Sequence, residues 1–184
     1  MAFHTILNET SAEKMRITSA GNVGIGVNNP GENLHVSASG RTSLRLEGIV
    51  TSDGVISDVQ FFNSTDSVAA INVNRVSNND QSDMTFHTQP NGGSVTERMR
   101  IDAIGNVGIG VVPDTTWLST RTALQVGGSG CLFGRQAAGA GGDIRLGENV
   151  YQHSGGSYRR LSGDEVSMYS QTNGTHTFGV AGSS

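Results

Sequence analysis

Apolar side chains alternate with polar residues or glycines in short runs along the whole chain. Met15 and Ile17 flank Arg16, and residues 23–27 alternate β-branched side chains with glycine. A period of two is typical of half-buried β-strands, and no stretch keeps the 3.6-residue apolar period of a helix. Further alternating runs lie at 34–36, 44–46, 55–61, 71–73 and 84–88. We therefore expect an all-β chain of short strands and hairpins with very little helix.

Turn-forming residues separate these runs. Asn-Gly, the strongest short hairpin signal, occurs at Asn91-Gly92 and again at Asn173-Gly174. Pro30-Gly31 ends the run at 23–27, because proline cannot donate a hydrogen bond to a neighbouring strand. The residues between Tyr151 and Tyr158 predict another hairpin.

One stretch occurs twice, 84 positions apart. The first copy is Glu-Lys-Met-Arg-Ile at 13–17 with Gly-Asn-Val-Gly-Ile-Gly at 21–26; the second is Glu-Arg-Met-Arg-Ile at 97–101 with the same six residues at 105–110. Phe-His-Thr precedes each copy, and a proline follows each. Such self-similarity predicts a repeated structural module. We assign 1–36 to the carboxyl-terminal half of one module, 37–126 to a second module, and 127–184 to a divergent third that is cut off at its end.

The composition indicates that one copy of the chain has too little to bury. The 184 residues include 26 glycines but only ten aromatic residues. Burial of large side chains has to offset the entropy of ordering the backbone. We therefore expect the missing burial in contacts with other copies. Glycine at every second position also predicts that another backbone approaches closely there, as three chains would near a threefold axis. The residues predicted to pack in this trimer are Met15, Ile17, Gly24, Ile25, Gly26, Met99, Ile101, Gly108, Ile109 and Gly110.

The repeated stretch resembles the repeat of tail-fibre and tail-spike proteins of tailed bacteriophages. Residues 97–113 match its Glu-Arg-Met-Arg-Ile-Asp, Gly-Asn-Val-Gly-Ile-Gly and proline fully, and residues 13–30 match with Lys14 and Thr18 in place of Arg and Asp. The resemblance implies an elongated, parallel homotrimer of interleaved strands, of the β-prism or triple-stranded β-helix type. It also implies a virion protein made in the host cytoplasm, with other tail-fibre or baseplate proteins as partners. Such fibres often end in a cleaved chaperone domain, and no chaperone-like segment is visible.

The expected function is attachment to a bacterial surface glycan or protein through multivalent trimeric contacts. Three aromatic residues outside the repeat are candidates for stacking on sugar rings: Trp117, Tyr151 and Tyr158. Trp117 fits equally well as a plug for an apolar gap. Three alternatives stay open: a passive shaft or collar segment, a spike that depolymerises polysaccharide, and a bacterial trimeric adhesin.

Other classes of function receive little support. The net charge is −4 and the basic residues are scattered, so we expect no nucleic-acid binding. No apolar run is long enough to span a membrane, and no secretion signal is visible. The glycines at 21–26 lead to Pro30 rather than to the helix that a nucleotide-binding loop requires. Cys131, the single cysteine, predicts a small buried hydrophobe.

We predict no catalytic residues, no metal and no cofactor, and hence no enzyme. The five histidines show no metal-ligand spacing within a chain. His4 and His87 occupy equivalent places in the repeat, so a threefold axis would supply either one three times. The carboxylates are spread over loops and none stands in a distinctive setting.

Overall fold

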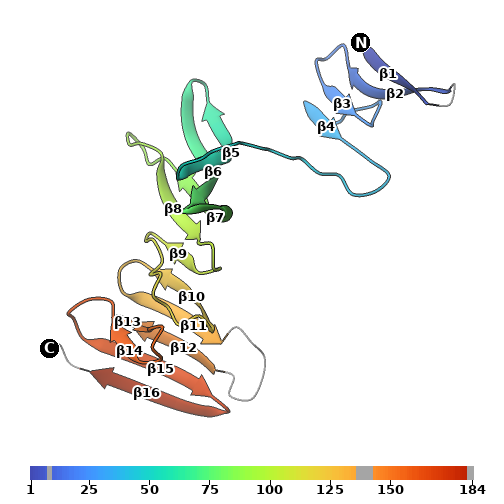
Figure 1. Ribbon diagram of the computed structural model, residues 1–184. Coiled ribbons are helices and arrows are strands. Elements are labelled where there is room, and N and C mark those ends of the chain that lie inside the picture. The colour runs from blue at the N-terminus through green and yellow to red at the C-terminus, as the bar shows by residue number, and fades with distance from the viewer. Residues whose placement is uncertain (8–9, 136–142, 182–184) are drawn as a thin grey trace. The chain divides into compact units, whose positions relative to one another are not determined.

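The computed structural model describes residues 1–7, 10–135 and 143–181, and all regular structure in these residues is β (Figure 1). The chain forms two compact units, Met1–Arg45 and Leu46–Ser184. The expected all-β class with very little helix is confirmed for the described residues.

The first unit is a four-stranded sheet with the order β1-β2-β3-β4. Its strands are β1 (Ala2–Leu7), β2 (Thr10–Ile17), β3 (Val23–Ile25) and β4 (Leu34–Val36). β1, β2 and β3 pair antiparallel, whereas β4 runs parallel to β3. The chain therefore leaves the sheet after β3 and returns beside it, and Pro30 lies in that crossover.

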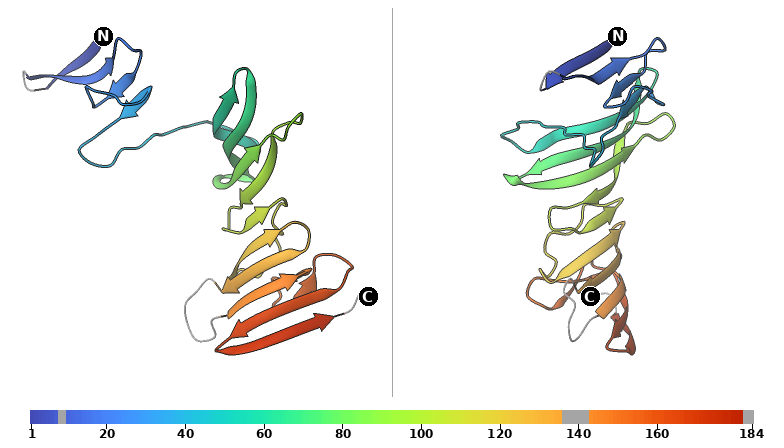
Figure 2. Two further views of the ribbon diagram at one scale, coloured as in Figure 1. Left: turned by 180° about the vertical axis from the view of Figure 1, so that it is seen from behind. Right: turned by 90° about the vertical axis from the view of Figure 1, so that its right-hand side faces the viewer.

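The second unit contains a ten-stranded sheet with the order β16-β15-β12-β11-β10-β9-β8-β7-β6-β5. Neighbouring strands follow one another like the rungs of a ladder (Figure 2). All neighbours pair antiparallel except β9 and β10, which are parallel. The strands are β5 (Gly54–Asn63), β6 (Asp66–Val76), β7 (Asn78–Thr88), β8 (Thr96–Ile101), β9 (Val107–Ile109), β10 (Arg121–Val126), β11 (Gly130–Arg135), β12 (Asp143–Glu148), β15 (Val166–Thr172) and β16 (Thr175–Ala181). A separate hairpin is formed by β13 (Val150–Gln152) and β14 (Tyr158–Arg160).

The repeat in the sequence is a repeat in the structure. Met15 lies opposite Ile25 in the first unit, and Met99 lies opposite Ile109 in the second. β3 and β4 pair in the same parallel register as β9 and β10. Even the irregularity after the repeated phenylalanine recurs, in β1 between Phe3 and His4 and in β7 between residues 86 and 87. One module is therefore four strands, β1 to β4 or β7 to β10.

Short-range polar contacts fix the turn inside each module. In the second copy the amide nitrogen of Asn106 donates to Asp102 Oδ1 (2.8 Å), and Asn106 Oδ1 accepts from the amide of Ala123 (3.0 Å). Asn106 is fully buried. In the first copy Thr18 Oγ1 accepts from the amide of Asn22 (3.1 Å). Aspartate and threonine are interchangeable here because both present an oxygen acceptor to the turn.

Gly24 and Gly108 are crowded within the single chain. A Cβ on Gly108 would lie 2.1 Å from the carbonyl oxygen of Val111, and one on Gly24 would lie 2.4 Å from that of Val27. The loop that follows in the same chain therefore supplies a close backbone at each glycine. The predicted packing of these glycines against another copy stays a prediction. Gly26 and Gly110 have a second reason to be glycine, since their φ angles of 71° and 67° are in the left-handed region.

A small core lies on one face of the ten-stranded sheet. It is formed by Trp117, Ala123, Cys131, Phe133, Val150 and Tyr151. The indole ring of Trp117 packs against Phe133 and Tyr151, with ring centroids 5.0 and 5.5 Å away. The segments on either side of β10 and β11 thus cover one face of those strands, and only that face.

The predicted module boundaries differ from the compact units. The boundary after residue 126 falls in the turn between β10 and β11, which pair directly, so the sheet continues across it. The boundary after residue 36 is close to the observed division, although residues 37–45 belong to the first unit. The strand expected at 44–46 is absent: Leu44 and Leu46 are exposed and have no neighbouring strand to pair with.

Gly108→Ala is expected to destabilise the fold by about 1–3 kcal/mol, because the new methyl group must displace the loop that carries Val111 and Pro113. Urea unfolding followed by circular dichroism measures this change. Gly128→Ala is the matched control, since a Cβ there meets nothing within 4 Å and φ is ordinary. Equal stability of the two variants would contradict the crowding.

Candidate oligomer interface

Two rows of apolar side chains cross one face of the ten-stranded sheet. Directly paired residues on nine neighbouring strands form the first row: Val73, Met84, Ile101, Val107, Leu124, Leu132, Leu146, Tyr169 and Phe178. The second row runs beside it over six strands: Val59, Ile71, Phe86, Met99, Ile109 and Val126. Residues two apart in a strand share a face, so both rows lie on the same side, called here the apolar face. At about 4.8 Å per strand the first row is roughly 40 Å long.

The apolar face is the side that the small core does not cover. Along β10 and β11 the buried residues Ala123, Cys131 and Phe133 alternate with Leu124 and Leu132 of the apolar face. Exposure rises towards β16, where Phe178 and Val180 are 81% and 87% exposed. A contiguous apolar surface of this length indicates an interaction site.

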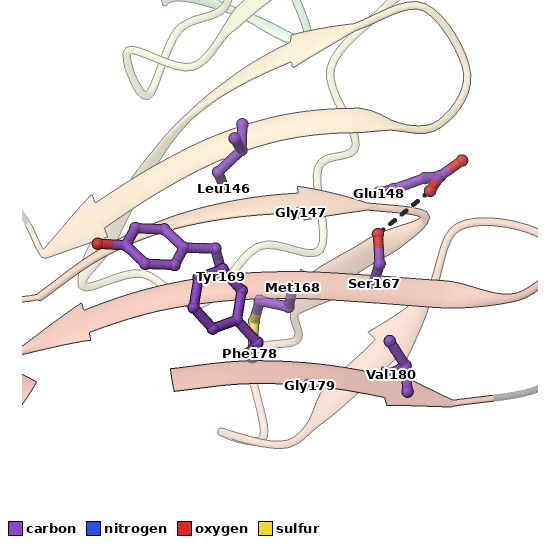
Figure 3. Close-up of a pocket in the computed structure, with 9 residues that line it drawn as sticks. All are labelled: Leu146, Gly147, Glu148, Ser167, Met168, Tyr169, Phe178, Gly179 and Val180. Carbon is purple, nitrogen blue, oxygen red and sulfur yellow. Dashed lines mark hydrogen bonds between the residues drawn. The ribbon is translucent and has the colours of Figure 1, made fainter. Parts of the chain in front are cut away.

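The apolar face is hollowed between β12, β15 and β16. Leu146, Tyr169 and Phe178 lie side by side on these strands, and Val180 follows on β16 (Figure 3). One polar contact interrupts the hollow, where Ser167 Oγ donates to Glu148 Oε2 (3.2 Å). An apolar side chain from another surface fits this hollow better than a polar ligand does.

The first unit repeats the same face on its four strands. Phe3, Met15, Ile25 and Val36 form one row, and Ile17, Val23 and Leu34 form the other. The residues predicted to pack in a trimer therefore divide in two. Met15, Ile17, Ile25, Met99, Ile101 and Ile109 lie on the apolar face, whereas Gly24 and Gly108 occupy intervening positions of the opposite face.

Two of the three aromatic candidates for receptor binding are buried. Trp117 is 3% exposed and Tyr151 is 8% exposed, so neither ring can stack on a sugar in this structure. Trp117 instead fills the gap between Phe133 and Tyr151, which is the other role that the sequence allowed. Tyr158 alone of the three is on the surface, at 42% exposure.

No protein-family model matches the chain, and no curated protein matches it.

An ion-pair cluster lies on the face opposite the apolar face. Both guanidinium amino groups of Arg121 contact the carboxylate of Asp143, which also accepts from Arg145 Nη2 (2.7 Å). Arg121 Nε donates to Gln152 Oε1 (2.7 Å), which ties β13 to the sheet. The hydrogen bonds from Arg121 lower the pKa of Asp143, and burial lowers the pKa of Arg145. This cluster could not be predicted from the sequence, because its members come from three separated strands.

The other chemistry-bearing residues have structural surroundings. Cys131 Sγ donates to the carbonyl of Val150 (2.8 Å), and burial raises the pKa of its thiol to about 11, so the reactive thiolate is scarce at neutral pH. His87 contacts Thr85 Oγ1 (3.0 Å) on the face opposite Phe86, and so does not point from the apolar face. Among the described residues, no group of three His, Cys, Asp or Glu side chains could hold a metal ion. The same residues contain no helix that could cross a membrane.

Asp143→Asn is expected to destabilise the second unit by about 3–5 kcal/mol, because it removes the negative charge that contacts the buried guanidinium groups of Arg121 and Arg145. Thermal unfolding by calorimetry measures the loss. Asp80→Asn, on an exposed residue, is the control and should stay within about 0.5 kcal/mol of the native protein.

The same carboxylate predicts a dependence on acid. Because the folded-state pKa of Asp143 is below its ordinary value of 3.8, its contribution is complete above pH 3.8 and is lost as the pH falls towards the folded-state pKa. Unfolding measured between neutral pH and pH 3 should show a smaller acid-induced loss in Asp143→Asn than in the native protein. Equal losses would show that Asp143 does not carry this dependence.

Proposed function

We propose that this chain is a section of a bacteriophage tail fibre, assembled as a parallel homotrimer, that attaches the virion to the bacterial surface. The single observation that supports this best is the apolar face, which recurs in both modules and which the chain itself leaves open. The repeat that builds the face is also the stretch that resembles tail-fibre proteins.

Three copies around one axis would bury the face on all sides. In a parallel arrangement each residue of a row meets its own equivalents, so Leu124 meets Leu124, and leucine, isoleucine and valine suit such a contact. Ladder-like sheets that each turn one face inward form a prism, and the length of the prism grows by about 4.8 Å for each strand added. Repetition of a four-strand module is therefore an economical way to lengthen a fibre.

The opposite face would then look outward and carry the contacts with the host. A trimer offers three identical sites, and several fibres on one particle multiply them. Weak individual contacts are sufficient under these conditions, so the proposal requires no catalytic residue.

Sedimentation equilibrium tests the trimer. We expect three times the chain mass of 19.2 kDa for the native protein. Leu146→Asp should yield monomers, because it places three carboxylates in an apolar contact. Leu146 is 59% exposed in the single chain, so the substitution should leave the fold of the single subunit intact. Ile104→Asp is the control, since Ile104 is 54% exposed in a turn outside the apolar face. A monomeric native protein, or a trimeric Leu146→Asp, would contradict the proposed assembly.

Adhesion is tested with the same proteins. The labelled native trimer should bind cells of susceptible strains in a bacterial panel, and the Leu146→Asp monomer should bind the same cells far more weakly. A trimer that binds no strain would support a passive shaft segment. Release of reducing ends from capsule would support the depolymerase alternative.

A further inference from the structure

Positive charge is concentrated in one part of the chain. Five of its eleven arginines lie between residues 121 and 160, where the only acidic residues are Asp143 and Glu148. This stretch therefore has a net charge of +3 in a chain of net charge −4. Glu148 pairs with Gly130 and with Ser167, and Gly130 in turn pairs with Val126 of the apolar face. Glu148 therefore lies on the apolar face. Of the two carboxylates in residues 121–160, only that of Asp143 lies on the opposite face.

Asp143 faces more than one cation. Arg121 and Arg145 both contact its carboxylate directly. Arg135 lies directly opposite Arg121 in the β10 and β11 pair, and its charge lowers the pKa of both Asp143 and Arg145. One carboxylate therefore lies among three guanidinium groups, and Arg135 is the exposed member of this cluster.

Tyr158 covers this charge. The Cζ atom of Arg145 lies 4.9 Å from the centroid of the Tyr158 ring, which is a cation–π contact. The Nε and Nη1 atoms of Arg145 are buried without a hydrogen-bond acceptor among the described residues. The exposed tyrosine is thus held over a buried cation, with Arg159 next to it in the chain and also exposed.

We propose that Tyr158 and Arg135 form a binding site for an acidic saccharide. The sugar ring packs on the exposed part of Tyr158, as aromatic side chains pack on the apolar face of a pyranose, and its carboxylate or phosphate binds Arg135. Arg145 does not touch the sugar and acts as a positioning residue that fixes the tyrosine ring. The inference rests on the proposed attachment function and adds the class of receptor.

The position of the site agrees with the assembly. The small core and the ion-pair cluster occupy the face opposite the apolar rows, as the alternation of Phe133 with Leu132 shows. Closing the apolar face against two further copies therefore leaves Tyr158 and Arg135 accessible, three times per trimer. A basic, aromatic site on an otherwise acidic chain suits the anionic glycans of bacterial surfaces.

Surface plasmon resonance with immobilised sugars tests the site. The probes are tri-galacturonate for a carboxylate, an oligomannose ending in mannose 6-phosphate for a phosphate, and neutral galactotriose. We expect the trimer to bind one or both acidic probes in preference to the neutral one, and to release them as salt rises. Arg135→Ser and Tyr158→Ala should each weaken binding about tenfold, the scale of one lost charge-assisted contact. Tyr158→Phe should keep it, because the ring remains.

Arg41→Ser is the matched control, since it removes an equal charge from an exposed residue outside this unit and should leave binding unchanged. Circular dichroism and sedimentation confirm that each variant is folded and trimeric. Binding of the neutral probe as tight as that of the acidic ones, no binding of either acidic probe, or unchanged binding in both site variants would overturn the inference. If the trimer still adheres to cells in any of these cases, the attachment function stands without this site; if it neither assembles nor adheres, the proposed function itself fails.

Discussion

The exposure of a continuous apolar face to water is the constraint on which the rest of the structure depends. In the ten-stranded sheet, direct pairing from Val73 to Phe178 places one apolar side chain on each of nine neighbouring strands. A hydrophobic row held open in this way is costly in water, and the described residues supply no second layer for it. The small core around Trp117 covers the other side of β10 and β11. We therefore propose that further copies of the chain bury the apolar face.

The two faces of the sheet in each module have different roles. Met99, Ile101, Val107 and Ile109 supply the apolar face, while Arg100 and Gly108 point to the other side. On that side Arg100 donates to Glu97 and to Asp83, and the loop through Pro113 folds over Gly108. Each module thus closes one face with its own loop and ion pairs and leaves the other for assembly. This division explains why glycine and the β-branched residues alternate so strictly in the repeat.

The sequence predicted the local structure well, because its signals are local. The period of two, the Asn-Gly turns and the repeated stretch identified β2, β3, β8 and β9 and the hairpins at 91–92 and 173–174. It could not reveal that β4 pairs parallel with β3 and that β10 pairs parallel with β9, because the sequence of one strand does not specify its pairing partner. For the same reason it did not identify the loop of the same chain that crowds Gly108, it placed Tyr151 on the surface, and it left two roles open for Trp117. The ion-pair cluster could not be predicted from spacing in the sequence, because only that long-range pairing brings Arg121, Asp143 and Arg145 together.

Alkylation of introduced thiols measures whether the native assembly protects the apolar face from solvent. Leu146→Cys and Ile104→Cys place thiols at positions that are 59% and 54% exposed in the single chain. The buried native Cys131 supplies the background rate. In the folded protein, a maleimide should modify the thiol at position 146 at least about tenfold more slowly than the thiol at position 104. In denaturant, the two thiols should react at the same rate. Equal rates in the folded protein would contradict the proposed burial of the apolar face.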